Sequence, residues 1–486
     1  MKGLYFTVSF FLFFGYLSRA QQPLFRTLDI DAGATESVQL SDGKRATVKL
    51  LSISDTRDKA RSAIREARAE VEINGSRATL FCGNYRLPVK VGSVQVDCTV
   101  TKAYYQNTNR DHWGLVKDAR LRAWPAGSPY MPPGSMVYPV RQVWFASRTQ
   151  MGNEPTYVDE GERITTDKIY YHAGLDIGGA EGLVDVIAAT DGLVVGLGTA
   201  VIDKVKDNPA IDNEFNDTIW VEDERGWYHR YTHLYSYDPS VKLGGRVVQG
   251  QKIGTLGKEG GSGGWAHLHY EIISRQPSAK FGTQEGYAFL WEAYQRQYKQ
   301  RLIAVARPHA AVLVGEKATL DGSRSWPASH ITSYNWTFTD GQTASGAKVE
   351  RVYSKAGTYS EILRIADDLR DVAYDFETVN VLDPQHPEQV PPSIQGAFFP
   401  TEGIAAGEPV TFKVRTFGTT DGEEHWSFGD GATATTKSDG NVDKHAKNGF
   451  AVTAHAFAKP GDYIVRVERT NRLGQTAMAH LWLHVD

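Results

Sequence analysis

The sequence lacks an excess of charge of either sign, and after residue 20 it lacks any apolar run of membrane-spanning length. Its 53 lysines and arginines stand against 57 aspartates and glutamates, which gives a formal net charge of −4. This balance gives no electrostatic argument for nucleic-acid binding. The lack of a later apolar run argues against stable insertion into a membrane.

The start of the chain has the features of a targeting segment. Lys2 provides a positive charge, residues 4–17 form an apolar run, and residues 18–20 (Ser-Arg-Ala) offer small side chains to a signal peptidase. No cysteine follows this run, so a lipid anchor is not expected. We therefore expect residues 1–20 to be a signal peptide and the mature protein to be secreted, periplasmic or at the cell surface.

Cysteine is almost absent, since Cys82 and Cys98 are the only two in the chain. A metal site built on them would need more ligands nearby, and a redox pair usually has the spacing CxxC. In an exported chain, two cysteines this close in sequence are typical of a structural disulfide. The sequence therefore predicts one disulfide that closes a short loop.

The abundant residues indicate strands and turns. The chain has 47 glycines and 23 tyrosines, and valine and threonine are frequent. Aromatic and β-branched residues favour strands, and glycine favours the turns between them. A chain of 486 residues is also too long for a single core. We predict a mainly β protein with several domains.

The first of these domains is predicted at residues 21–125. Apolar and polar residues alternate through residues 65–73, which is the periodicity of a strand. Asn74-Gly75 is a two-residue hairpin turn, and residues 77–82 are the returning strand. This pattern predicts a small β-sandwich-like domain. Residues 57–66 could instead form a short helix, because they contain several helix-forming residues.

Two connecting segments follow from composition and periodicity. Residues 126–165 are rich in proline, glycine and tyrosine, which predicts an irregular connection that wraps the next domain and could lie over an active site. One amphipathic helix is predicted over residues 284–306, where the apolar residues recur at helical spacing. These residues are Leu290, Trp291, Tyr294, Tyr298 and Leu302. The stripe is interpreted as core packing.

The C-terminal part contains an internal repeat. The phrase Trp336-Thr-Phe-Thr-Asp-Gly recurs as Trp426-Ser-Phe-Gly-Asp-Gly, and each copy is followed by an aromatic, glycine and tyrosine phrase. That phrase follows at a longer distance in the second copy, so an insertion is predicted at residues 437–448. Short alternating strands in a repeat of this length predict tandem β-sandwiches.

These copies resemble the Ig-like repeat of polycystic kidney disease (PKD) domains. The resemblance implies PKD-like β-sandwiches at residues 307–384 and 392–486, joined by a proline-rich linker. It implies extracellular spacer or adhesion modules, with possible contact to carbohydrate or matrix.

A set of polar residues lies between these regions. His267 and His269, in the phrase Trp-Ala-His-Leu-His-Tyr-Glu, are two apart and would share one face of a strand. His172 and Asp176 lie four apart in His-Ala-Gly-Leu-Asp, and His233 lies in Tyr-Thr-His-Leu-Tyr. Each of these alone could be an ordinary strand or turn residue. Together they are hard to explain without a metal.

The order of these motifs, with the glycine-rich phrases between them, closely resembles the lysostaphin/LytM-type zinc endopeptidases. The resemblance implies a β-rich catalytic domain at residues 166–280 with Zn²⁺ as cofactor. Three ligands leave an open position for water, and the resemblance gives them as His172, Asp176 and His269. It leaves His233 and His267 as the catalytic pair, without assigning which is the base. No HExxH motif occurs, so this is not the glutamate-assisted type of zinc protease.

The resemblance implies an exported zinc endopeptidase that hydrolyses peptide bonds in the cross-links or stem peptides of peptidoglycan. Two alternatives stay open: a non-catalytic protein that binds or regulates at the cell wall, and a metal-dependent enzyme that acts on an extracellular polysaccharide or protein. The acidic segment 199–216 could rim the groove and alter the choice of substrate. Trp265 could form a groove wall or pack in the core, and His229 is interpreted as a strand-face residue without a catalytic role.

Overall fold

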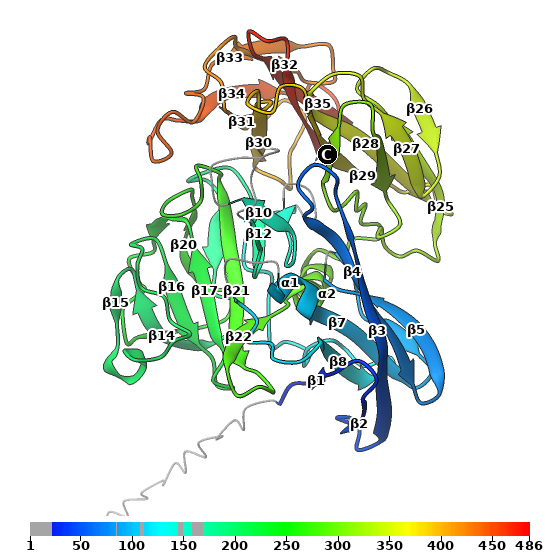
Figure 1. The fold of residues 1–486 in the computed structure, drawn as a ribbon. Coiled ribbons are helices and arrows are strands. Elements are labelled where there is room, and N and C mark those ends of the chain that lie inside the picture. Colours follow the sequence, from blue (N-terminus) through cyan, green and yellow to red (C-terminus); the bar gives the residue numbers. More distant parts are fainter. Residues whose placement is uncertain (1–21, 84, 107–110, 144–148, 158–168) are drawn as a thin grey trace, which may run out of the picture.

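The computed structural model of the chain describes residues 22–83, 85–106, 111–143, 149–157 and 169–486, and its regular structure is almost all strand (Figure 1). The predicted mainly β class is confirmed. Within these ranges no helix is both long enough and apolar enough to cross a membrane. The predicted signal peptide, residues 1–20, lies outside the described residues, as does part of the predicted connection 126–165.

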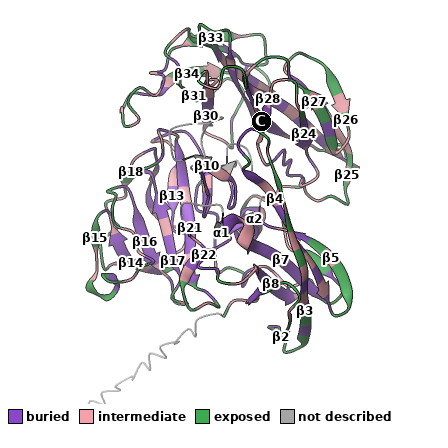
Figure 2. Ribbon diagram, in the orientation of Figure 1, coloured by how far each residue is buried: buried purple, intermediate pink, exposed green. Residues whose placement is uncertain are grey.

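Two four-stranded sheets enclose one apolar core in the N-terminal region. The elements are β1 Arg26–Ile30, β2 Thr35–Gln39, β3 Arg45–Arg57, β4 Ile64–Ile73, β5 Ser76–Phe81, β6 Val89–Val91, β7 Val94–Thr101, α1 Lys102–Gln106 and β8 Ala119–Pro125. The sheet orders are β2-β3-β4-β5 and β1-β8-β7-β6. Strand β5 leaves much of its length exposed at the rim of the molecule (Figure 2).

The local predictions for this region hold in part. Asn74 and Gly75 have φ angles of 49° and 84°, so the Asn-Gly pair forms the tight turn between β4 and β5. A helix over residues 57–66 is wrong, because β3 continues to Arg57 and β4 begins at Ile64. The alternation of buried and partly exposed residues along β4 prevails over the helix-forming composition before it.

The predicted disulfide is not formed in the structure, which holds Cys82 and Cys98 as buried free thiols. Their Sγ atoms lie 2.7 Å apart on adjoining backbone segments. The two residues are therefore neighbours, as the sequence predicts, without the covalent bond.

The middle region is a large antiparallel sheet with a smaller one beside it. Its elements are β9 Thr149–Gln150, β10 Pro155–Tyr157, β11 Ile169–Tyr171, β12 Leu175–Gly178, β13 Asp185–Ile187, β14 Gly192–Leu197, β15 Ala200–Val201, the 3-10 helix η1 Asp203–Val205, β16 Ile219–Glu222, β17 Tyr228–Thr232, β18 Leu234–Tyr237, β19 Arg246–Val247, β20 Lys252–Leu256, β21 His267–Arg275, β22 Phe281–Gln284 and α2 Tyr287–Tyr298. The large sheet has the order β15-β14-β16-β17-β21-β12-β9, and the small sheet has the order β13-β20-β18.

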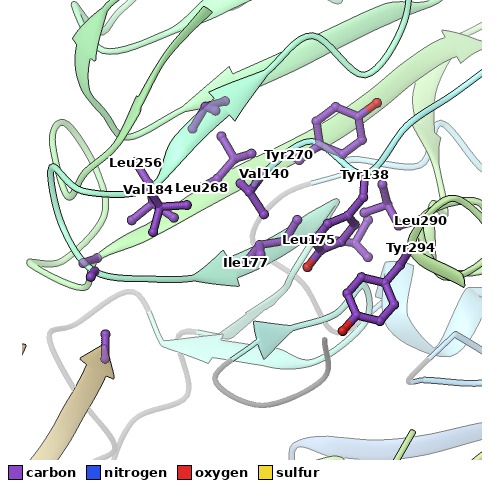
Figure 3. Close-up of a cluster of buried hydrophobic side chains, with 14 of the residues drawn as sticks. Tyr138, Val140, Leu175, Ile177, Val184, Leu256, Leu268, Tyr270, Leu290 and Tyr294 are labelled. Carbon is purple, nitrogen blue, oxygen red and sulfur yellow. The ribbon is translucent and has the colours of Figure 1, made fainter. Parts of the chain in front are cut away.

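Helix α2 is shorter than the predicted range of residues 284–306. It ends at Tyr298, and the next residue, Lys299, adopts the left-handed conformation with φ of 51° and caps the last turn. The aromatic stripe of α2 packs in the core, as predicted. Figure 3 shows Leu290 and Tyr294 of this stripe near the core side chains of β12 and β21. These side chains belong to one apolar cluster: Leu175, Ile177, Leu268, Tyr270, Leu290 and Tyr294.

The C-terminal region consists of the two repeats. The first contains β23 Ala310–Leu313, β24 Lys317–Asp321, β25 Ile331–Thr337, β26 Thr343–Ser345, β27 Lys348–Val352, β28 Gly357–Asp367 and β29 Val372–Leu382. The second contains β30 Ser393–Phe399, β31 Pro409–Phe417, β32 Glu424–Ser427, β33 Thr433–Thr436, β34 Ala451–Ala456, β35 Gly461–Thr470 and β36 Thr476–Val485. Trp336 and Trp426, which begin the repeated phrases, are both buried.

The two repeats are joined by a shared sheet as well as by the linker. Strands β28 and β36 pair in parallel, with Thr358 opposite Ala477, so one nine-stranded sheet runs through both repeats. The second repeat also lies against the middle region (Figure 1), and its core residues belong to the same apolar cluster as β12, β21 and α2. The predicted insertion, residues 437–448, lies in the connection between β33 and β34.

Candidate metal centre and active site

The polar residues of the two histidine motifs lie on neighbouring strands. β12 and β21 are antiparallel, and Asp176 is directly opposite His269 in their register. His267 and His269 are two apart on β21, so both face away from the core side that Leu268 and Tyr270 occupy. His172 lies in the turn before β12, and His233 follows the last residue of β17. Strand pairing thus brings three separate stretches of sequence together.

Three of these side chains converge so closely that they could hold a metal ion. One ligand atom from each of His172, Asp176 and His269 lies within 4.8 Å of the others. The His172 Nε2 atom is 3.1 Å from both His269 Nδ1 and Asp176 Oδ1, and His269 Nδ1 is 2.8 Å from Asp176 Oδ1. Ligands at the bond lengths of tetrahedral zinc stand roughly 3.4 Å apart. The donor set and its spacing therefore fit such an ion after a shift of a few tenths of an ångström.

A glycine makes the turn between the first two of these residues. Gly174 has a φ of 80°, and a Cβ atom there would lie 2.7 Å from the carbonyl oxygen of Tyr270 on the neighbouring strand. The turn carrying His172 is held from its other side, since the His172 N–H donates to the Glu154 carbonyl at 2.8 Å and its carbonyl accepts from the Asn153 N–H at 2.8 Å. His172 therefore has a fixed backbone position.

His267 is oriented by its own chain. Its Nδ1 lies 3.1 Å from the Trp265 carbonyl, so this nitrogen carries the proton in the neutral ring and donates it there. The Nε2 atom is then free of a proton and lies 3.5 Å from Asp176 Oδ1. Burial lowers the pKa of His267 to about 3. The ring is thus a neutral imidazole whose unprotonated Nε2 faces the three ligand residues.

His233 is held in an uncommon backbone conformation next to His267. Its φ is 69°, a region that non-glycine residues rarely adopt. The Asp217 carboxylate accepts the His233 backbone N–H at 2.9 Å and lies 3.1 Å from Nδ1, which is also 2.7 Å from the Glu259 carbonyl. Burial opposes the charge on Asp217, but hydrogen bonding and charge attraction from His233 outweigh it and lower the pKa of Asp217. The His233 and His267 ring centres are 4.7 Å apart.

A second carboxylate stands behind His269. Glu271 Oε2 is 3.7 Å from His269 Nε2, and Arg230 lies 3.9 Å from the same carboxylate. Burial opposes both charges, yet contact with His269 lowers the pKa of Glu271 to about 2, and contact with Asp176 and Glu271 raises the pKa of His269 to about 9. His269 therefore sits in a negative environment that favours a cation at its Nδ1.

The structure brings together all five residues that the sequence singled out. Asp217 and Glu271 were not predicted as partners. Glu271 could have been found, because it is two residues after His269 and shares its strand face, whereas nothing in the acidic segment marks Asp217. His229 is fully buried, with Nδ1 2.7 Å from the Tyr270 hydroxyl and Nε2 3.1 Å from Asp223, and takes no part in the centre.

Trp265 packs against the second repeat and does not form a wall of an open groove. Its ring stacks on Phe417 of the second repeat, with ring centres 4.0 Å apart and an angle of 7° between the planes. The acidic segment 199–216 runs into Asp217, and its Asp212 pairs with Arg230 at 3.4 Å.

Several solved structures are distantly similar to this chain. Two crystal forms of Helicobacter pylori Csd3 are each 13% identical; they match 51% and 53% of this chain and 82% and 81% of that one, with TM-scores of 0.20 and 0.18. Fibronectin(III)-like modules of Clostridium thermocellum CbhA are 10% identical over 38% of this chain and 94% of theirs, with a TM-score of 0.15. These scores are too low to support a functional argument. Comparison with curated proteins gives no match.

Three segments of the chain match models of known protein families. Residues 170–280, which contain all five site residues, match the model of peptidase family M23. Residues 301–379 and 397–480 each match a model of the PKD domain. The chain therefore carries an M23-family peptidase domain, of the type the lysostaphin/LytM resemblance implied, followed by two PKD domains.

Proposed function

We propose that this protein is an exported zinc metalloendopeptidase that hydrolyses peptide bonds in peptidoglycan cross-links or stem peptides. The observation that carries the proposal is the convergence of His172, Asp176 and His269 within 4.8 Å, inside a peptidase domain and beside two further histidines. A histidine pair and one carboxylate form the ligand type that catalytic zinc takes in hydrolases.

The three ligands of the proposed site are His172 Nε2, Asp176 Oδ1 and His269 Nδ1. Zinc bound there would supply a Lewis acid that lowers the pKa of a water molecule and polarises a peptide carbonyl. Glu271 would keep the His269 ring in place from behind, as carboxylates do for zinc-bound histidines. Asp176 brings a negative charge that offsets part of the charge of the ion.

The hydrogen bonds of the two remaining histidines support different roles. His267 is neutral with a bare Nε2, so it suits the general base that takes the proton of the attacking water and later passes it to the leaving amine. His233 has the Asp217 carboxylate behind its Nδ1, which stabilises a protonated ring. A protonated His233 would donate from Nε2 to the oxygen on which negative charge develops.

The substrate class rests on the resemblance to cell-wall endopeptidases together with the export signal predicted from sequence. Such a protein meets cell-wall peptides outside the cytoplasm. The disulfide between Cys82 and Cys98 belongs to the same proposal, because export would place these adjacent thiols in an oxidising compartment.

The test is an assay of purified residues 21–486 on isolated peptidoglycan, with the products read by mass spectrometry. We expect new free amines, which disappear on addition of a chelator and in the His267→Ala variant. His425→Ala is the matched control, because this histidine is exposed on β32 of the second PKD domain. Binding without cleavage would favour a non-catalytic wall protein, and new sugar ends would favour action on polysaccharide. Either result contradicts the proposal.

A further inference from the structure

The loop that leads into the catalytic strand is held by the second PKD domain. Gln395 on β30 is buried, and its side-chain amide binds both backbone groups of Ala266. The Ala266 N–H donates to Gln395 Oε1 at 2.8 Å, and Gln395 Nε2 donates to the Ala266 carbonyl at 2.7 Å. Ala266 immediately precedes His267, so a side chain from another domain fixes the residue next to the proposed base.

Two glycines of the same loop are held in a similar way. Arg415 Nη1 donates to the Gly264 carbonyl at 3.1 Å, and Asn441 Nδ2 donates to the Gly263 carbonyl at 3.0 Å. Gly264 has a φ of 91°, and a Cβ atom there would collide with the Asn441 and Arg415 side chains. A glycine is thus required at this point by the docking of the PKD domain as well as by the backbone conformation.

The insertion of the second repeat takes part in this contact. Arg415 is fully buried and pairs with the Asp439 carboxylate, with its Nε 2.9 Å from Oδ1. Asp439 and Asn441 both belong to the segment 437–448, which the first repeat lacks. The extra residues of the second copy therefore build the side of the PKD domain that faces the peptidase loop.

Trp265 connects these contacts to His267. Its indole stacks on Phe417 of the PKD domain at 4.0 Å between ring centres. Its carbonyl is the group that accepts the His267 Nδ1 proton at 3.1 Å. The peptide that sets the tautomer and angle of His267 is therefore held on one side by Phe417 and on the other by Gln395.

A second anchor lies further along the same interface. Lys413 Nζ donates to the Glu181 carbonyl at 2.6 Å, and the buried Glu181 carboxylate pairs with Lys258 at 2.9 Å. Lys258 adjoins Glu259, whose carbonyl accepts from His233 Nδ1. Both histidines of the proposed catalytic pair are thus connected to the second PKD domain, His267 through Trp265 and His233 through the longer path of Glu259, Lys258 and Glu181.

We propose that the second PKD domain is part of the catalytic unit and that Gln395 is a positioning residue for His267. This inference rests on the proposed function, since it assigns Gln395 to the reaction of that site. The side-chain amide of Gln395 binds the backbone of Ala266, so it acts on His267 through Ala266 and the Trp265 carbonyl. A misplacement of about 1 Å in a catalytic group lowers the rate by about a hundredfold.

The test compares Gln395→Ala with Gln475→Ala in the full mature chain. Gln475 is a buried glutamine of the same domain whose amide donates to Gln389, away from the peptidase. We expect Gln395→Ala to lower kcat at least tenfold while KM and bound zinc stay near the wild-type values, and Gln475→Ala to keep the wild-type kcat. Hydrogen exchange should also quicken in residues 261–268 of Gln395→Ala only.

A milder variant guards against a folding defect in Gln395→Ala. Asn441→Gly removes one hydrogen bond to the loop and suits the φ of 59° at this position, so it should lower kcat to a smaller extent with the melting temperature preserved. Folded Gln395→Ala protein with wild-type kcat, or equal losses in Gln395→Ala and Gln475→Ala, would overturn the inference alone. An inactive wild-type chain would instead overturn the proposed function, and the catalytic part of the inference with it.

Discussion

Asp217→Asn is the substitution that best tests the different roles proposed for His233 and His267. It keeps the shape of the side chain and removes its charge. Asp217 is buried, and its carboxylate accepts the His233 backbone N–H at 2.9 Å and lies 3.1 Å from Nδ1. If His233 must be protonated to meet the developing oxyanion, loss of the carboxylate raises the cost of that protonation.

The size of the effect follows from the contacts that are lost. A hydrogen bond to a charged group contributes about 1.5–3 kcal/mol net, and each 1.36 kcal/mol of transition-state stabilisation is tenfold in rate. The amide oxygen that replaces the carboxylate can still accept the backbone N–H, so only the charge-assisted bond to the ring is lost. We therefore expect kcat to fall between about tenfold and a hundredfold. KM should change little, since Asp217 lies behind the ring and not beside the substrate.

The measurement is the initial rate of amine release from peptidoglycan at several substrate concentrations. Asp212→Asn is the matched control, because it removes a carboxylate from the adjoining acidic segment 199–216. This carboxylate pairs with Arg230 at 3.4 Å. A kcat within twofold of wild type in a folded Asp217→Asn protein would refute the assignment of His233 as the protonated partner. An equal loss in both variants would show a general charge effect instead.

Three further predictions concern metal, acidity and thiols. Removal of zinc by a chelator should lower the melting temperature as well as the activity, because an ion that binds only the folded state stabilises it. In a thermal scan, the melting temperature of Asp176→Ala should be the same with and without the chelator. Burial opposes the charge on Asp223, but His229 and Arg225 outweigh it and lower its pKa from 3.8 to about 2. Asp223 should therefore contribute about 2 kcal/mol of stability above pH 4, which is lost as the pH falls through 2. The free energies of unfolding of the wild type and of Asp223→Asn, measured by denaturation, should converge over that range. Thiol titration of denatured protein exported to an oxidising compartment should find no free cysteine, whereas reduced protein should give both Cys82 and Cys98.

The parts of the site that could be predicted from the sequence are those fixed by local spacing. His267 and His269 are two apart on a strand, and His172 and Asp176 are joined by a glycine turn, so a short stretch of chain decides how each pair points. The alternative of a short helix over residues 57–66 is wrong for the opposite reason. Pairing with β3 and β5 determines the conformation of β4 and its flank, and composition alone does not report that pairing.

Partners that come from distant sequence could not be predicted. Asp217 stands among several acidic residues, and only the folded chain shows that it is the one beside His233. No sequence feature predicts the contact between Gln395 and the peptidase loop, because an isolated glutamine in a strand is usual in any β-sandwich. The pairing of β28 with β36, which makes one sheet of both PKD domains, likewise depends on edges that the sequence does not mark.

Two separate structural requirements act on the glycine-rich loop before His267. From sequence, glycines there are typical of a turn that enters a strand. The structure adds a second demand, since Gly263 and Gly264 lie against Asn441 and Arg415 of a domain that follows much later in the chain. A spacer domain would need no such fit, because it would leave the loop free in solvent. The close fit at Gly264 is therefore the strongest reason to treat the peptidase and the second PKD domain as one working unit.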